Sequence, residues 1–142
     1  MLERVREFVG RHIAFSVFLI CLVDCAFLFY AANSLSISYK EAEIFFEKTS
    51  LLGYILKASV HLLGQNDFAL RAVMIAFHIL SVILMYKVSK FYIKLEFDRL
   101  IAVLLFVLLP GTIASALIVN NAGICIALAL FCIYLFHIRS KI

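Results

Sequence analysis

The stretch that decides the fold is Ser38–Arg71, which reads SYKEAEIFFEKTSLLGYILKASVHLLGQNDFALR and is the one long charged segment between runs that are almost wholly apolar. Hydrophobic residues make up 65% of the 142 positions and charged residues only 15%, with a mean hydropathy of +1.09. In soluble domains the apolar share is about half. The composition therefore indicates an integral membrane protein in which Ser38–Arg71 lies at the membrane surface.

Outside this loop, the apolar runs approach the roughly 20 residues that a helix needs to cross the hydrocarbon core. We expect an all-α membrane protein in which residues 1–142 form a single membrane domain with about four transmembrane helices. One or two short interfacial helices are expected in the first outer loop, 33–68. The predicted spans are 13–32, 69–86, 100–119 and 122–138.

Basic residues predict the orientation, because positively charged loops resist translocation. With the N-terminus inside, nine of the 13 lysines and arginines would lie on the cytoplasmic side, and both termini would be cytoplasmic in a multi-pass cell inner membrane protein. The net charge of +4 follows from this bias, so a nucleic-acid partner is not needed. The cytoplasmic set is Arg4, Arg6, Arg11, Lys87, Lys90, Lys94, Arg99, Arg139 and Lys141; Lys40, Lys48, Lys57 and Arg71 would lie outside.

The outer loop carries the capping signals of two helices. Ser38 followed by Glu41 is a capping box, and Thr49 or Ser50 can cap a second helix that Gly64 ends. This second helix is too short to span, and we expect it to lie in the interface.

Asp24 stands in the middle of the first span, where an ionised side chain costs at least ~3 kcal/mol. His78 of the second span falls at a similar depth, so the two are predicted to form an intramembrane polar pair. A protonated Asp24 that bonds to backbone or to Ser81 is an equally weighted alternative. Further along, Pro110–Gly111 predicts a kink in the third span, which either opens a cavity or is only a structural bend.

Glu41, Glu43 and Glu47 place three carboxylates within the outer loop. Such groups can act as a general base or hold a divalent cation, so the cofactor is left open. A solvated acidic helix end is the structural alternative. No metal ligand set is assigned.

The order of these motifs resembles the N-terminal region of GT-C type membrane glycosyltransferases. It is most similar to the family-39 group, which includes protein mannosyltransferases and the aminoarabinose transferases that modify lipid A. The matching pieces are KEAEIFF at 40–46, FEK at 46–48, GQNDFALRA at 64–72 and LLPG at 108–111.

The resemblance implies a polyprenyl-phosphate-linked sugar as donor, a hydroxyl or lipid acceptor, and an acidic general base in the first outer loop. Carried onto this chain, that role falls on Glu41, with Glu43 as a second catalytic candidate, although Lys40 stands where the family motif has its leading aspartate. Lys48, Arg71 and Asn121 are candidates for substrate binding through the donor phosphate.

Members of this group have more spans, so we expect the chain to be the first part of such an enzyme, completed by a C-terminal portion or by an oligomer. An alternative from another class is a small four-span transporter or lipid-sugar flippase that uses Asp24 as its coupling carboxylate. A non-catalytic membrane subunit is a third. The enzyme needs Glu41, whereas the transporter needs Asp24.

Overall fold

The structure is a computed structural model that describes residues 12–47 and 50–140. Within these ranges the chain folds into helices joined by short connections, with no strand, so the expected all-α fold is confirmed. The helices are α2 (Ile13–Ser34), α3 (Tyr39–Phe46), α4 (Leu51–Leu63), α5 (Asp67–Tyr92), α6 (Glu96–Leu108), α7 (Pro110–Leu117) and α8 (Ala122–Arg139).

The helices α2, α5 and α8 are each long and apolar enough to cross a membrane. Helices α6 and α7 form an apolar pair bent by 55°, so the described residues hold three candidate spans, or four where the bent pair is counted as one broken span. This agrees with the expected all-α membrane protein of about four transmembrane helices with one or two shorter helices in the outer loop. Helix α5 has 26 residues and is longer than the apolar run 69–86 that predicts it. It continues through Lys87 and Lys90 to Tyr92, so its last turns are outside the apolar run.

The break between α6 and α7 lies at Pro110–Gly111, where the sequence predicts a kink in the third span. Leu109 has an extended backbone between the two helices, and Pro110 begins α7 at a position where its missing N–H is not needed. The Thr112 hydroxyl lies 2.7 Å from the carbonyl oxygens of both Phe106 and Leu109. Both carbonyls also accept backbone N–H groups, that of Phe106 from Leu109 and that of Leu109 from Thr112 and Ile113, so the hydroxyl adds a further contact across the break.

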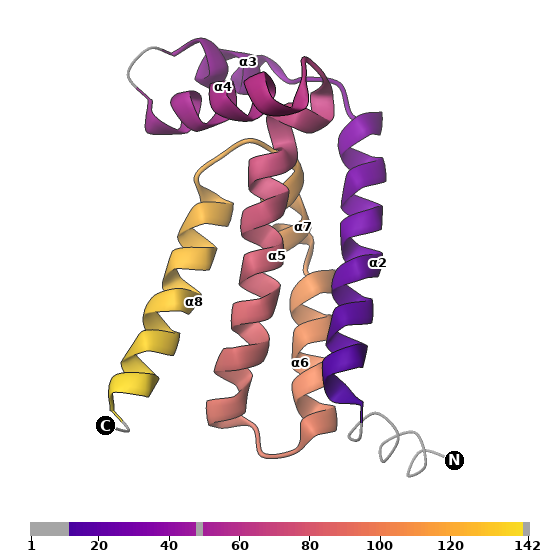
Figure 1. The fold of residues 1–142 in the computed structure, drawn as a ribbon, viewed down its shortest axis with the longest axis vertical. Coiled ribbons are helices and arrows are strands. Elements are labelled where there is room, and N and C mark those ends of the chain that lie inside the picture. The colour runs from indigo at the N-terminus through magenta and orange to yellow at the C-terminus, as the bar shows by residue number, and fades with distance from the viewer. Residues whose placement is uncertain (1–11, 48–49, 141–142) are drawn as a thin grey trace.

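Figure 1 shows the spanning helices standing side by side, with α3 and α4 laid across one end of the bundle. We call this the capped end, and the opposite end, where α5 and α8 finish, the basic end. Helix α5 contacts α2, α4, α6, α7 and α8, so it is the centre of the bundle. Apolar clusters along α5 form the core; their buried members are Leu52, Leu56, Leu70, Met74 and Val119, then Leu28, Ala32, Ile75 and Ala116, then Val82, Val103 and Val107.

The two short helices of the capped end begin and end where their capping signals predict. Ser38 and Glu41 make both bonds of the capping box, and the Ser50 side chain accepts from the N–H of Gly53. Gly64 follows α4 with φ of 91°, a conformation that favours glycine. The helices α3 and α4 approach closely at Gly53, where a Cβ would lie 2.7 Å from the carbonyl oxygen of Ile44.

Candidate functional site at the capped end

Arg71, in the first turns of α5, is buried beneath α3, with 2% of its surface exposed. Its Nε and Nη2 donate to the two carboxylate oxygens of Glu41 at 3.1 and 3.0 Å. The remaining donors reach the end of α2 and the segment after it: Nη1 donates to the carbonyls of Ala32 and Leu35 at 2.8 and 2.6 Å, and Nη2 to that of Ser36 at 3.0 Å. All five guanidinium N–H groups therefore have acceptors.

Glu41 is as deeply buried as Arg71, with 1% of its surface exposed. Besides Arg71, it accepts from the backbone N–H of Ser38 at 2.8 Å and from that of Val119, in the turn between α7 and α8, at 3.2 Å. Four donors match the four lone-pair directions of a carboxylate. This buried ion pair, which we call the polar knot, joins α2, α3, α5 and the α7–α8 turn.

The knot also determines the charge of Glu41. Burial alone would raise the pKa of its carboxyl, but the hydrogen bonds from Arg71, Ser38 and Val119 and the positive charge of Arg71 outweigh burial and hold that pKa below its ordinary value. An ionised carboxylate with every acceptor position filled is poorly suited to take a proton from a substrate. Both Glu41 and Arg71 therefore have the geometry of positioning residues.

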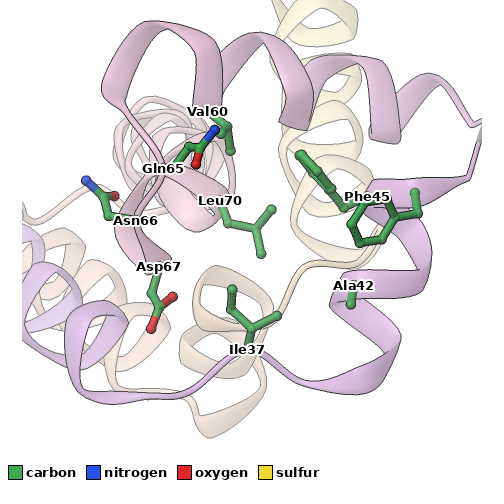
Figure 2. Close-up of a pocket in the computed structure, with 9 residues that line it drawn as sticks. Ile37, Ala42, Phe45, Val60, Gln65, Asn66, Asp67 and Leu70 are labelled. Atoms are coloured by element: carbon green, nitrogen blue, oxygen red, sulfur yellow. The ribbon is translucent and has the colours of Figure 1, made fainter.

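Beside the knot, a pocket of about 390 Å³ opens between α3, the end of α4 and the start of α5. In Figure 2, Leu70 lies at its centre, with Ala42 and Phe45 of α3 on one side and Asn66 and Asp67 on the other. The walls are mainly apolar, and the amide and carboxylate groups are gathered along one edge. The pocket has the mixed character of a site for an amphipathic ligand.

Asp67 is the carboxylate of this pocket that sequence reasoning missed. It is half-buried, lines the pocket, and makes no hydrogen bond or ion pair with any residue that the structure describes. In the sequence it reads only as an acid in the first turn of a helix, which the macrodipole already explains. Its neighbour Asn66 is the N-cap of α5 and accepts from the Ala69 N–H at 2.6 Å.

The other predicted site residues are not gathered around the pocket. Glu43 is exposed on α3, and Asn121 is exposed at the start of α8. Neither lines the pocket, nor does Lys40, which is also exposed. Lys48 lies outside the described residues.

Asp24 and His78 meet in the middle of the bundle, where His78 Nε2 lies 2.9 Å from Asp24 Oδ2 and both side chains are buried. The alternative partner, Ser81, instead donates to the carbonyl of Phe77. Asp24 also lines a second cavity of about 440 Å³, which lies between α2, α6 and α7 at the break between the last two. A cavity therefore accompanies the kink at Pro110–Gly111, as one of its two interpretations in the sequence expects.

A divalent cation finds no ready-made site in 12–47 or 50–140, where no three His, Cys, Asp or Glu side chains are grouped as metal ligands. The sequence predicts Glu41 as a possible cation ligand, but its carboxylate oxygens already accept hydrogen bonds within the polar knot. These residues therefore do not fit a metal centre built on Glu41.

These features define an α-helical, multi-pass membrane protein with an amphipathic pocket at one end of its bundle. The family described as dolichyl-phosphate-mannose-protein mannosyltransferase matches residues 47–141, and the chain belongs to this family. No curated protein and no solved structure matches the chain. The family match includes Arg71 and Asn121, whereas the KEAEIFF segment lies just before it.

Proposed function

We propose that the protein takes part in sugar transfer from a polyprenyl-phosphate-linked donor to a hydroxyl-bearing acceptor at the outer face of a cell inner membrane. The family membership carries this proposal. The pocket at the capped end supports it, since apolar walls suit the chain of a lipid-linked substrate and a polar edge suits its head. With the positive-inside bias, this end faces outward and both termini are cytoplasmic.

Asp67 is the proposed general base in place of Glu41, because it lines the pocket while Glu41 is engaged in the knot. In the transfer step, the base takes the proton of the acceptor hydroxyl, and the hydroxyl oxygen attacks the anomeric carbon of the sugar. The bond from that carbon to the phosphate oxygen breaks, and polyprenyl phosphate leaves. Glu43, exposed on α3, is the second candidate base.

Phosphate contacts are proposed for Lys48 and Asn121, because Arg71 has no donor left for a ligand. Asn121 lies exposed at the turn between α7 and α8, beside the backbone N–H of Val119 that anchors Glu41. The Glu41–Arg71 pair then has an indirect role. It holds α3 and α5 at the spacing that forms the pocket.

Binding of radiolabelled dolichyl-phosphate-mannose to the purified full chain tests the pocket. The variant Ala42→Phe fills the pocket and should lower binding at least about tenfold, the loss expected when a buried apolar site is blocked. The matched control Ala58→Phe places the same ring on the exposed face of α4 and should bind normally. Equal binding by both variants would remove the pocket from the proposal.

Transfer of the labelled sugar to a hydroxyl acceptor tests the base. Asp67→Asn should reduce transfer by about 10²–10⁴-fold while leaving donor binding intact, which is the usual contribution of a general base. Undiminished transfer by Asp67→Asn, or a larger loss in Glu43→Gln, would reassign the role. If the wild type binds the donor without transferring sugar, the protein is a binding subunit.

A second candidate function, a transporter or flippase, is favoured by one observation: the Asp24–His78 pair borders the cavity between α2, α6 and α7. Movement of a lipid-linked sugar by reconstituted protein would then depend on Asp24 and not on Asp67. Transbilayer movement of a fluorescent lipid-linked sugar, compared between Asp24→Asn and Asp67→Asn, separates the two functions.

A further inference from the structure

Basic side chains gather at the end of the bundle opposite the pocket, and no ion pair among the described residues joins them to Glu96 or Asp98 in the first turn of α6. Lys87, Lys90 and Lys94 are all exposed. The structure contains two ion pairs among its described residues, Arg71–Glu41 and His78–Asp24, and neither lies at this end. The three ammonium groups therefore have no carboxylate partner within the described chain.

Two of these lysines are held over aromatic rings. Lys90 Nζ lies 4.5 Å from the centre of the Tyr86 ring, and Lys87 Nζ lies 5.4 Å from that of Tyr134, which comes from α8. Cation–π contact restricts an ammonium group without neutralising it, and its remaining N–H donors stay available. The basic end thus presents oriented positive charges.

More aromatic rings surround the pair. His137 of α8 stacks on Phe91 at 4.9 Å and meets the edge of Tyr92 at 5.0 Å. Tyrosine and histidine rings beside lysine are typical of the membrane–water interface, where an apolar ring and a polar tip are both accommodated. The ends of α5 and α8 are joined by this aromatic cluster.

The depth of the lysines agrees with the interface. From Arg71, fixed in the knot at the capped end, to Lys90 the helix rises by about 29 Å at ~1.5 Å per residue. This rise equals the thickness of a hydrocarbon core, ~30 Å. Lys87 and Lys90, three residues apart on one helix face, therefore reach the level of the lipid phosphates.

We propose that the basic end binds the headgroup of an acidic phospholipid, with Lys87 and Lys90 holding its phosphate and the rings of Tyr86 and Tyr134 fixing the two ammonium groups. The charges are complementary, and the location at the ends of spanning helices selects a lipid over a soluble anion. This site is independent of the pocket and of sugar transfer.

The test reconstitutes the full chain in phosphatidylcholine vesicles with spin-labelled phosphatidylglycerol or spin-labelled phosphatidylcholine, and measures the fraction of each probe that the protein immobilises. The wild type should prefer phosphatidylglycerol about fivefold or more, the ratio expected from one lysine near an anionic lipid. At ~1 M salt the preference should fall, because the Debye length is then only about 3 Å. Equal immobilisation of both probes by the wild type would overturn the proposal.

Matched single variants then separate a site from diffuse charge. Lys87→Gln and Lys90→Gln should each remove most of the preference, whereas Lys94→Gln removes the same charge from the same end and should keep it. Tyr134→Leu keeps the charge and should still weaken the preference, since Lys87 loses its ring. An equal loss in Lys94→Gln, or full preference in Tyr134→Leu, would contradict the site; far-UV circular dichroism checks that each variant is folded.

Discussion

The two ends of the bundle use their charges in opposite ways. At the capped end, Arg71 and Glu41 bind each other, and backbone groups take up all their remaining donors and acceptors. At the basic end, Lys87 and Lys90 lie over aromatic rings, and their charged ammonium groups stay exposed at the surface. The comparison teaches that a charged residue in a membrane protein is not by itself a ligand-binding residue; the number of its donors and acceptors already in use decides this.

The same comparison changes how the pocket is understood. The order of the sequence motifs predicts that Glu41 is catalytic and that Arg71 binds substrate. In the structure these two residues use their hydrogen-bonding groups to hold the fold together. The carboxylate that lines the pocket, Asp67, lies in a segment where the sequence gives a structural reason for an acid. The residues that hold the capped end together and the carboxylate that lines the pocket are thus different residues, although Asp67 and Arg71 are only one helical turn apart at the start of α5.

Removing Arg71 should produce the largest loss of stability. Arg71→Gln leaves Glu41 buried without its cation, and breaking one side of a buried pair costs about 3–5 kcal/mol. Arg99→Gln is the matched control at the basic end, where, among residues 12–47 and 50–140, Arg99 donates to the backbone carbonyls of Ile93 and Lys94 and forms no ion pair. Thermal unfolding in detergent measures both, and similar losses would erase the contrast between the two ends.

The Asp24–His78 pair should come next. His78→Leu leaves Asp24 without its partner in the apolar middle of the bundle, a loss of about 1–3 kcal/mol for an unsatisfied buried group. The double variant Asp24→Leu/His78→Leu should be more stable than the single one, because apolar replacement of a whole buried pair is often neutral. A double variant less stable than His78→Leu would mean that the two side chains are not coupled.

Gly53→Ala probes the packing of α3 on α4, which covers the knot. The added Cβ meets the Ile44 carbonyl at 2.7 Å, so the helices must separate at a cost of about 1–3 kcal/mol. Gly111→Ala is the control, since nothing lies within 4 Å of its Cβ. Unfolding midpoints that fall equally in the two variants would show that the close approach is not required.

Acid should weaken the capped end through Glu41. Its pKa is lowered in the folded protein, so the folded state binds this proton less readily than the unfolded chain. The stabilisation is therefore fully present above the ordinary carboxyl pKa and is lost as the pH falls through the folded value. The unfolding temperature should drop more steeply with acid in the wild type than in Glu41→Gln, and parallel pH profiles would contradict this.

The smallest effect is expected at the basic end. Lys87→Gln and Lys90→Gln each remove one exposed cation–π contact, which contributes about 0.5–1 kcal/mol. Their unfolding midpoints should stay near that of the wild type, in contrast to Arg71→Gln. A large destabilisation by either lysine variant would indicate that the basic end, like the capped end, uses its charges to hold the fold.

The sequence by itself determined the membrane class, the helices and their caps, because these depend on local signals. Long apolar runs need a bilayer, Ser38 with Glu41 specifies a helix start, and Pro110 breaks a span through its missing N–H. These inferences hold whatever the helices pack against. For Asp24, equal depth indicated His78 as a partner but left a bond to backbone or to Ser81 as an equal alternative, and the packing of α2 on α5 brings Asp24 and His78 to 2.9 Å.

Only the tertiary structure decided which charges are free. Arg71 and Glu41 are 30 residues apart, and the bond from Val119 to Glu41 joins positions 78 apart, so no local pattern indicates that both side chains are saturated. The same holds for Asp67, whose place in a pocket depends on how α3 and the end of α4 lie around the start of α5. Hydrogen-bond capacity is used up by contacts between distant segments, and that is a property of packing rather than of sequence spacing.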